Sequence, residues 1–162
     1  MSQHTDTVRE QIVGLLPRLR RFARTLARNP HDADDLVQIA VERALLRIGQ
    51  WRPETSLAPW MFGIVRNAWI DETRSRGRRE RLLGPEEAPQ GCDASAAQMQ
   101  LWSIQAAMER LPEDQRAAIG LVLVEGLSYK EAAEVLEVPV GTLTSRLARG
   151  REALAAALGD KR

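Results

Sequence analysis

The stretch from residue 128 to 151, SYKEAAEVLEVPVGTLTSRLARGR, constrains the fold of this chain more than any other segment. Ser128 and Glu131 form an S-x-x-E capping box, which marks a helix start. Pro139 ends that helix, because proline lacks an N–H group. A second helix follows, with three arginines and no acidic residue from 142 to 151. The pattern predicts a helix-turn-helix, whose second helix can enter the DNA major groove. Plain helical packing stays open as an alternative, although the arginines favour phosphate contacts.

The charge of the chain is segregated along the sequence. The 162 residues carry a net charge of only +1, and their number suits one domain or two small ones. Residues 66–81 hold six arginines against three acids, whereas residues 30–56 hold five acids against three arginines. These blocks indicate at least two kinds of partner surface, although solvated helix faces would explain either block alone.

Several function classes lack the residues that they need. Cys92 is the only cysteine, so no intramolecular disulfide or thiol-based metal site can form, and we expect an exposed loop thiol there. His4 and His31 fit no metal-ligand spacing, and the adjacent Asp34 and Asp35 diverge on a helix. We therefore expect no catalytic site, no metal and no cofactor. The N-terminus has no signal-peptide pattern and no segment is a membrane span, which predicts a cytoplasmic chain without membrane insertion.

Helical periodicity dominates the first 81 residues. The pattern predicts helices over 7–27, where Pro17 should split or kink the chain, and from an N-cap at Asp32 to about residue 49. A third helix, capped by Ser56, has one apolar face. Its flank carries a tryptophan, an asparagine and two arginines, at Trp60, Asn67, Arg74 and Arg78. That flank suits a nucleic acid, with arginine on phosphates, but a core Trp60 beside solvated arginines is an equal alternative.

The segment 82–98 divides the chain. It has two prolines, two glycines, three acids and no basic residue, which is typical of a flexible linker. We therefore predict an all-α protein with two small helical domains, 1–81 and 99–162, joined by the acidic linker 82–98. In the second domain we expect a helix restart at Pro112 and a C′ glycine at Gly126. The apolar residues expected to form its core are Ile119, Leu121, Val122, Leu123 and Val124.

Three blocks of the sequence resemble one protein family. DADDLVQIAVERAL, then WRPETSLAPWMFGIVRNAWID, then LPEDQRAAIGLVLVEGLSYKEAAEVLEVPVGTLTSRLARGREAL occur in the order seen in bacterial extracytoplasmic-function (ECF) RNA polymerase sigma factors of the sigma-70 family. The resemblance covers about residues 8–158. It implies a σ2-like helical bundle, which binds core polymerase and the −10 promoter element, and a σ4-like helix-turn-helix domain, which binds the −35 element.

The resemblance also assigns residues to roles. The acidic helix resembles the σ2 surface that grips the β′ clamp helices of the polymerase, through Asp34, Asp35, Leu36, Gln38 and Glu42. The loop and helix that follow resemble the −10 reader, in which a flipped base needs a stacking surface and polar groups. The −10 candidates are Trp51, Arg52, Glu54, Thr55, Trp60, Arg66, Asn67, Arg74 and Arg78. The −35 candidates are Tyr129, Lys130, Thr142, Thr144, Ser145, Arg146 and Arg149.

One position departs from the family pattern. Family members often have a Val-Lys pair where this chain has Leu143-Thr144. The loss of that lysine removes one phosphate or base contact, so the preferred −35 sequence is expected to differ. The acidic linker is compatible with the family's use of this segment in the RNA exit channel, by analogy alone.

The implied mechanism is binding without covalent chemistry. Core polymerase, through its β′ clamp helices and β flap, should separate the two domains to the spacing of the promoter elements, and base capture should favour melted DNA. The expected partners are therefore core RNA polymerase, promoter DNA and an anti-sigma factor, as in a stress response, with a monomer when the chain is alone.

Three other functions are alternatives to this one. A sigma-like decoy would bind an anti-sigma factor but not DNA, and such mimics typically sit beside a receiver domain, which this sequence lacks. A stand-alone helix-turn-helix regulator would leave the first domain and its Trp-rich loop unexplained. An enzyme would need a nucleophile, a metal spacing or a phosphate-binding loop, and none is found in the sequence.

Overall fold

The computed structural model describes residues 2–27, 29–83 and 95–159, and every regular element in these ranges is helical. An N-terminal half contains α1 (Ser2–Leu26), α2 (Pro30–Leu46), the 3-10 helix η1 (Ile48–Gln50) and α3 (Leu57–Leu83). A C-terminal half contains α4 (Ala96–Arg110), α5 (Glu113–Ile119), the π-helical segment η2 (Gly120–Val124), α6 (Tyr129–Leu136) and α7 (Val140–Gly159). The expected all-α fold class is confirmed.

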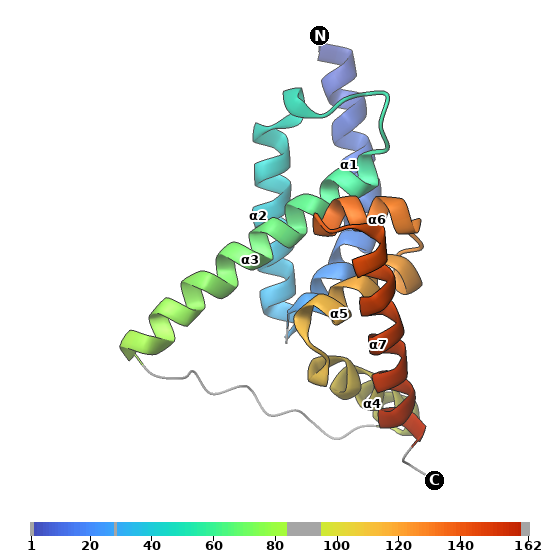
Figure 1. The fold of residues 1–162 in the computed structure, drawn as a ribbon. Helices are drawn as coiled ribbons and strands as arrows, with labels where there is room; N and C mark the ends of the chain where they lie inside the picture. The colour runs from blue at the N-terminus through green and yellow to red at the C-terminus, as the bar shows by residue number, and fades with distance from the viewer. Residues whose placement is uncertain (1, 28, 84–94, 160–162) are drawn as a thin grey trace.

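The N-terminal half is a bundle in which α2 and the first half of α3 pack against α1 (Figure 1). The apolar stripe of α1 is buried there, with Phe22 edge-to-face against Phe62 of α3 at a ring-centroid distance of 5.4 Å. Helix α1 starts earlier than expected and continues through Pro17 without a split. Pro17 has no N–H group to donate to the carbonyl of Val13, four residues earlier in the helix. Both residues lie on the exposed side of the helix, where water can replace the missing hydrogen bond.

The start of α2 differs from the sequence prediction. Asn29, not Asp32, is the N-cap: its side-chain oxygen accepts a hydrogen bond from the backbone N–H of Asp32 at 2.8 Å. Pro30 then occupies the first turn, where its missing N–H costs nothing. Asp32 lies within the first turn. Its Oδ1 forms an ion pair with Nη2 of Arg76 in α3 at 2.7 Å, and this pair connects α2 to α3.

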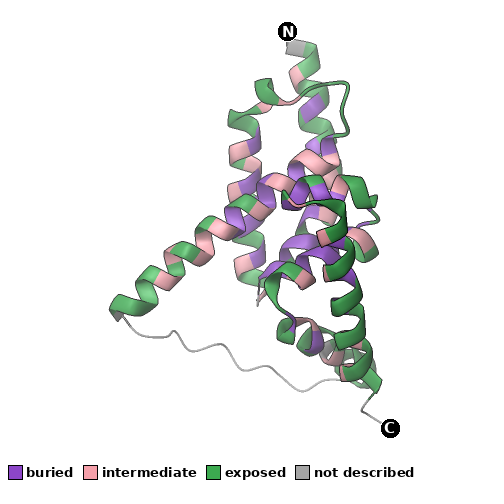
Figure 2. Cartoon of the chain, in the orientation of Figure 1, coloured by how far each residue is buried: buried purple, intermediate pink, exposed green. Residues whose placement is uncertain are grey.

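Helix α3 is buried at its start and exposed at its end. Leu57, Met61, Ile64 and Ala68 are buried, as their helical spacing predicted. Beyond the bundle the last turns of α3 project away from the other helices, and Figure 2 shows them as mostly exposed or intermediate. The sequence left Trp60 either as a core residue or as part of a nucleic-acid face. In the structure Trp60 is half-buried and packs against the core, so it retains an accessible edge.

The C-terminal half contains the expected helix-turn-helix. The hydroxyl of Ser128 accepts a hydrogen bond from the N–H of Glu131 at 3.1 Å and starts α6. Glu137 ends α6 in the left-handed conformation with a φ of 54°, and α7 begins directly after Pro139. Leu143 and Leu147 are buried, which fixes the face that α7 turns to its neighbours.

The segment before the helix-turn-helix was only partly anticipated. Pro112 is the N-cap of α5 and Gly126 has a positive φ of 72°, in agreement with the predicted restart and C′ glycine. Residues Gly120–Val124 continue α5 as a π-helix, which no sequence pattern indicated. The added residue per turn rotates the end of this segment, so Leu123 and Val124 are exposed by 47% and 49% and do not belong to the core.

The two halves share one continuous hydrophobic core. The end of α1 packs against α5 and η2, and α6 lies across the first half of α3. Gly120 permits the closest approach, since a Cβ atom there would lie 2.9 Å from Cγ2 of Thr25. The division into domains 1–81 and 99–162 stays a prediction. The central residues of the predicted linker 82–98, with Cys92, lie outside the described residues.

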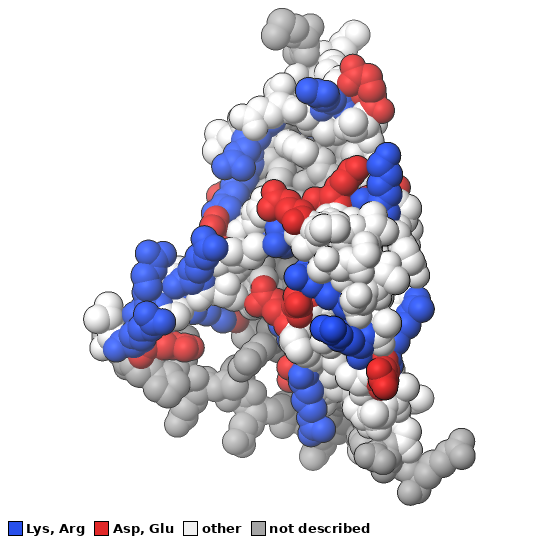
Figure 3. Space-filling view, in the orientation of Figure 1, with Lys and Arg blue, Asp and Glu red and all other residues white. Residues whose placement is uncertain are grey.

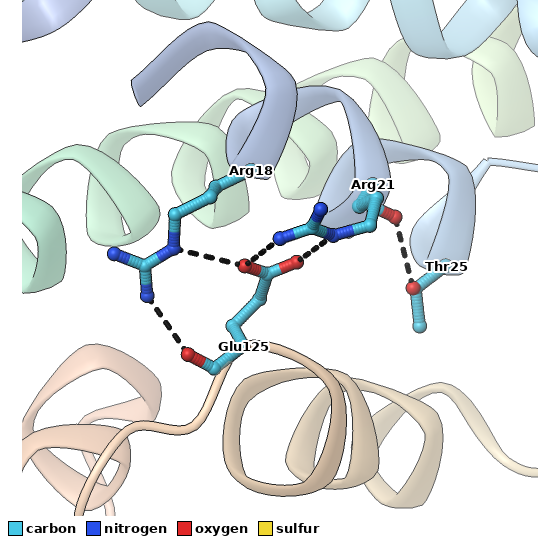
Figure 4. A network of polar contacts seen from close by, with 4 residues as sticks. All are labelled: Arg18, Arg21, Thr25 and Glu125. Carbon is cyan, nitrogen blue, oxygen red and sulfur yellow. Dashed lines mark hydrogen bonds and ion pairs between the residues drawn. The ribbon is translucent and has the colours of Figure 1, made fainter. Parts of the chain in front are cut away.

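A polar cluster joins the halves beside this core (Figure 4). The side chain of Glu125, at the end of η2, is fully buried and receives bonds from two arginines of α1. Arg18 donates from Nε to Oε2 at 3.1 Å and from a terminal nitrogen to the Glu125 carbonyl at 2.8 Å. Arg21 donates from Nε to Oε1 at 3.0 Å and from a terminal nitrogen to Oε2 at 3.2 Å. The hydrogen bond to Glu125, and then its charge, raise the pKa of Arg21 above the ordinary value.

Two glycine substitutions test the backbone of this fold. Gly126→Ala should lower the free energy of unfolding by about 1 kcal/mol, because an L side chain is strained at positive φ. Gly14→Ala should raise it by up to about 1 kcal/mol, because a Cβ there meets no atom within 4 Å and alanine favours helix. Urea unfolding followed by circular dichroism measures both. Equal stability of the Gly126 variant and wild type would contradict the positive φ in solution.

Candidate nucleic-acid and protein interface

Helix α7 presents a polar face opposite its buried leucines. Thr144, Ser145 and Arg149 are exposed, and Thr142 is half-buried beside them. The hydroxyl of Thr144 donates to the carbonyl of Val140 at 2.9 Å, and that of Ser145 donates to the carbonyl of Gly141 at 3.1 Å. Their protons are therefore turned back to the helix, while oxygen lone pairs face outward. This face has the residue types that contact phosphates and base edges.

The remaining −35 candidates differ in exposure. Tyr129 and Lys130 are exposed in the first turn of α6, where backbone phosphates can reach them. Arg146 is half-buried, and its Nε lies 3.3 Å from the carboxylate of Asp114 in α5. That ion pair holds α7 against α5, so Arg146 supports the position of the helix in this state as well as adding charge to it.

A cavity of about 380 Å³ lies where the predicted −10 face meets α6. Thr55, Trp60 and Asn67 line it from the N-terminal half, and Glu134 and Glu137 line it from the C-terminal half. It combines an aromatic surface with amide and hydroxyl groups, which is what an unstacked base requires. Arg47 and Gln50 also line the cavity. Sequence reasoning missed both, since only the fold brings the end of α2 and η1 to this place.

The structure separates Trp51 from this cavity. The indole of Trp51 is half-buried, its Nε1 has no hydrogen-bond partner among the described residues, and the ring of His4 stacks near it at a centroid distance of 6.5 Å. Arg52 and Glu54 are exposed in the same loop. The N–H and hydroxyl of Thr55 both donate to the carbonyl of Arg52, at 3.0 and 2.8 Å, and so shape the turn.

The outer part of α3 carries a row of positive charge. Arg74 and Arg78 are exposed there, and basic side chains gather at the projecting end of the helix in Figure 3. Arg66 lies nearer the bundle and is half-buried. Its Nη1 lies 3.4 Å from a carboxylate oxygen of Glu137, so this −10 candidate is already engaged by the C-terminal half.

Four of the five residues predicted to bind core polymerase lie on an exposed surface of α2. Asp34, Asp35, Gln38 and Glu42 are exposed, and positions 34, 38 and 42 recur at the four-residue spacing of one helix face. Leu36 does not belong to this surface. It is 2% exposed and packs in the core, because the helix turns that side toward α1 and α3.

Among residues 2–27, 29–83 and 95–159, no group of three or more His, Cys, Asp or Glu side chains could hold a metal ion. Within the same ranges, no helix has the length and apolar character needed to cross a membrane.

Comparisons with known proteins agree on one family. The family description Sigma-70 region 2 matches residues 12–79, and Sigma-70, region 4 matches residues 101–154. The ECF RNA polymerase sigma factor EcfG of Rhodopseudomonas palustris is 37% identical over 156 residues, which cover 95% of this chain and 86% of that protein. The ECF RNA polymerase sigma factor SigM of Mycobacterium tuberculosis is 36% identical over 141 residues, which cover 87% and 71%.

Solved structures show the same likeness in three dimensions. The sigma factor RpoE of Bartonella quintana, in complex with the anti-sigma factor NepR, matches with a TM-score of 0.86 at 30% identity, covering 96% of this chain and 99% of that one. CnrH in complex with the cytosolic domain of CnrY has a TM-score of 0.73 at 24% identity, which supports the fold alone. From the two family matches and the identity along nearly its whole length, the chain belongs to the ECF family of RNA polymerase sigma factors.

Proposed function

We propose that this sigma factor uses the two faces described above to read the −10 and −35 promoter elements while bound to core RNA polymerase, and that it melts DNA by binding alone. The observation that carries this proposal is the cavity bordered by Thr55, Trp60 and Asn67, because it combines stacking and hydrogen-bonding groups beside a row of arginines. The exposed face of α7 supports reading of duplex DNA at the −35 element. We place the chain in the cytoplasm, where polymerase and DNA are found.

We assign core-polymerase binding to Asp34, Asp35, Gln38 and Glu42 on α2. The exposed carboxylates of Asp34, Asp35 and Glu42 can pair with basic side chains of the β′ clamp helices, and the amide of Gln38 can add a hydrogen bond. The −10 assignment keeps Trp51, Arg52, Glu54, Thr55, Trp60, Arg66, Asn67, Arg74 and Arg78. The −35 assignment keeps Tyr129, Lys130, Thr142, Thr144, Ser145, Arg146 and Arg149. An anti-sigma factor and the β flap complete the proposed partners.

The first test is co-elution with sigma-free core polymerase in size-exclusion chromatography. Wild type should co-elute, and Asp35→Arg with Gln38→Ala should abolish co-elution by reversing a charge at the centre of the acidic face. Glu10→Arg with Gln11→Ala is the matched control, since it makes the same change on exposed positions of α1. Failure of folded wild-type protein to co-elute would contradict the proposal and favour a decoy or a polymerase-independent regulator.

The −35 assignment predicts a salt-dependent loss. Arg149→Ala should weaken promoter binding by the holoenzyme and lower the slope of log K against log salt by about 1, because one phosphate contact is removed. Binding titrations at several salt concentrations measure the slope, on a promoter selected from a random library by the wild-type holoenzyme. Arg20→Ala, an exposed arginine of α1, should leave affinity and slope unchanged. An unchanged slope for Arg149→Ala would remove this residue from the DNA contact.

The −10 assignment predicts a defect in melting more than in binding. Asn67→Ala should reduce open-complex formation at least tenfold while duplex binding through α7 persists, because Asn67 lines the cavity where an unstacked base would lie. Permanganate reactivity of unpaired thymines measures opening, and gel mobility measures binding. Gln11→Ala, which removes an exposed amide from α1, is the control. Normal opening by the Asn67 variant would contradict the role of the cavity.

A further inference from the structure

The tryptophan of the loop after η1 carries a second aromatic ring on its face. The imidazole of His4 in α1 lies nearly parallel to the indole of Trp51, with an interplanar angle of 12° and ring centroids 6.5 Å apart. Aromatic pairs attract each other at centroid distances of about 4.5–7 Å, so this stack lies at the loose end of the range. His4 is exposed and Trp51 is half-buried. A ring from solution can therefore compete for the same indole face.

The resting position of Trp51 is weakly held. Its Nε1 is buried and has no hydrogen-bond partner among the described residues, although the ring packs against the core. A buried donor without an acceptor costs at least as much free energy as an aromatic pair gains. His4 lies in the first turn of α1, which begins at Ser2, and the N–H groups of a first turn have no partner within the helix. Displacement of the imidazole therefore breaks few bonds.

The loop around Trp51 suits a single strand of DNA. Arg52 follows directly and is exposed, so a cation can meet a phosphate beside the indole. Gln50 and Thr55, on the two sides of this loop in the sequence, line the cavity proposed for an unstacked base. A strand with one base in that cavity would therefore carry a neighbouring base toward Trp51. Aromatic side chains beside cations are the usual platform on which single-stranded bases stack.

We propose that Trp51 is a second base-stacking site for the melted −10 strand, separate from the cavity, and that His4 occupies this site until a base displaces it. The inference rests on the proposed −10 assignment and deepens it. A nucleobase has a larger π surface than an imidazole, and a base on an aromatic side chain gains more than a typical aromatic pair. The base therefore takes the indole face once the strand is melted, and the imidazole lowers the affinity for that base.

Nuclear magnetic resonance tests the stack in the chain alone. The sequence has two histidines, His4 and His31, whose ring protons give separate signals. The signals of His4 should move in Trp51→Leu, because the ring current of the indole is removed. His31 is the internal control, since it is exposed on α2 beside Asp35, and its signals should stay in place.

Abasic oligonucleotides test the base site in the holoenzyme. The probe is the fluorescein-labelled −10 strand of the promoter that the wild-type holoenzyme selects, with each base removed in turn, and anisotropy measures its binding. Removal of one base should weaken binding by wild type at least fivefold and should not weaken binding by Trp51→Leu, because that base and the indole form one contact. The position coupled to Trp51 should differ from the position coupled to Asn67. Trp51→Phe keeps a smaller ring and should show a smaller effect, which covers a failure of Trp51→Leu to fold.

The same probes test the part played by His4. His4→Ala should tighten binding of the intact strand about two- to tenfold, because the base no longer displaces a ring. On the strand that lacks the base coupled to Trp51, His4→Ala should bind like wild type. His4→Phe keeps an aromatic ring over the indole and should give no gain. Gln3→Ala changes the neighbouring exposed position of α1 and is the matched control.

The outcomes separate this inference from the proposed function. Unmoved His4 signals in Trp51→Leu, or a gain in His4→Ala that persists on the abasic strand, would reject the competition by His4. A set of abasic strands in which no position is coupled to Trp51, while one is coupled to Asn67, would reject the base site and leave the −10 reading intact. No binding of the −10 strand by folded wild type with core polymerase would reject both. Circular dichroism confirms that each variant is folded.

Discussion

The buried carboxylate of Glu125 is the constraint on which the arrangement of the molecule depends. A charge without exposed surface must be paired, and its only described partners lie more than 100 residues earlier, on α1. Satisfying it fixes η2 against α1, and with η2 come α6 and α7. The position of α6 across α3 follows from this, and so do the place of the cavity and the direction in which α7 faces. One acid at the end of an apolar run therefore sets where both candidate DNA faces lie.

The charges outside this contact are sorted by helix. Helix α2 exposes carboxylates, the outer half of α3 exposes arginines, and α7 exposes hydroxyls with two arginines, Arg149 and Arg151. Each helix is anchored by an apolar stripe on its other side, so its charged side chains can serve a partner without disturbing the core. This division explains how a chain with a net charge of +1 can offer surfaces to both an acidic and a basic partner.

Local signals in the sequence were enough for the helices but not for their contacts. The capping serine at 128, the proline at 139 and the three- and four-residue spacing of α3 act within a few residues, and all three expectations are confirmed. The cap at Asn29 is also local, a bond from the N–H of Asp32, and the sequence prediction placed it three residues too late. The π-helix and the outward turn of Leu123 and Val124 depend on neighbours far away in the chain. The burial of Leu36 and the pairing of Arg66 with Glu137 also need the third dimension. A lone Glu125 within an apolar run was the one available hint of the contact between the halves.

The hydroxyl geometry of α7 affects which bases the proposed −35 face could distinguish. The hydroxyls of Thr144 and Ser145 donate to the carbonyls one turn back, so in this geometry each offers acceptor lone pairs to a neighbour. In the major groove, acceptors suit the exocyclic amino groups of adenine and cytosine and not the oxygen edges of guanine and thymine. In the proposed −35 contact, an accepting hydroxyl of Thr144 would stand where a donating lysine stands in many relatives. On the proposed −35 face, that exchange would favour an amino group over a carbonyl oxygen at this step of the groove.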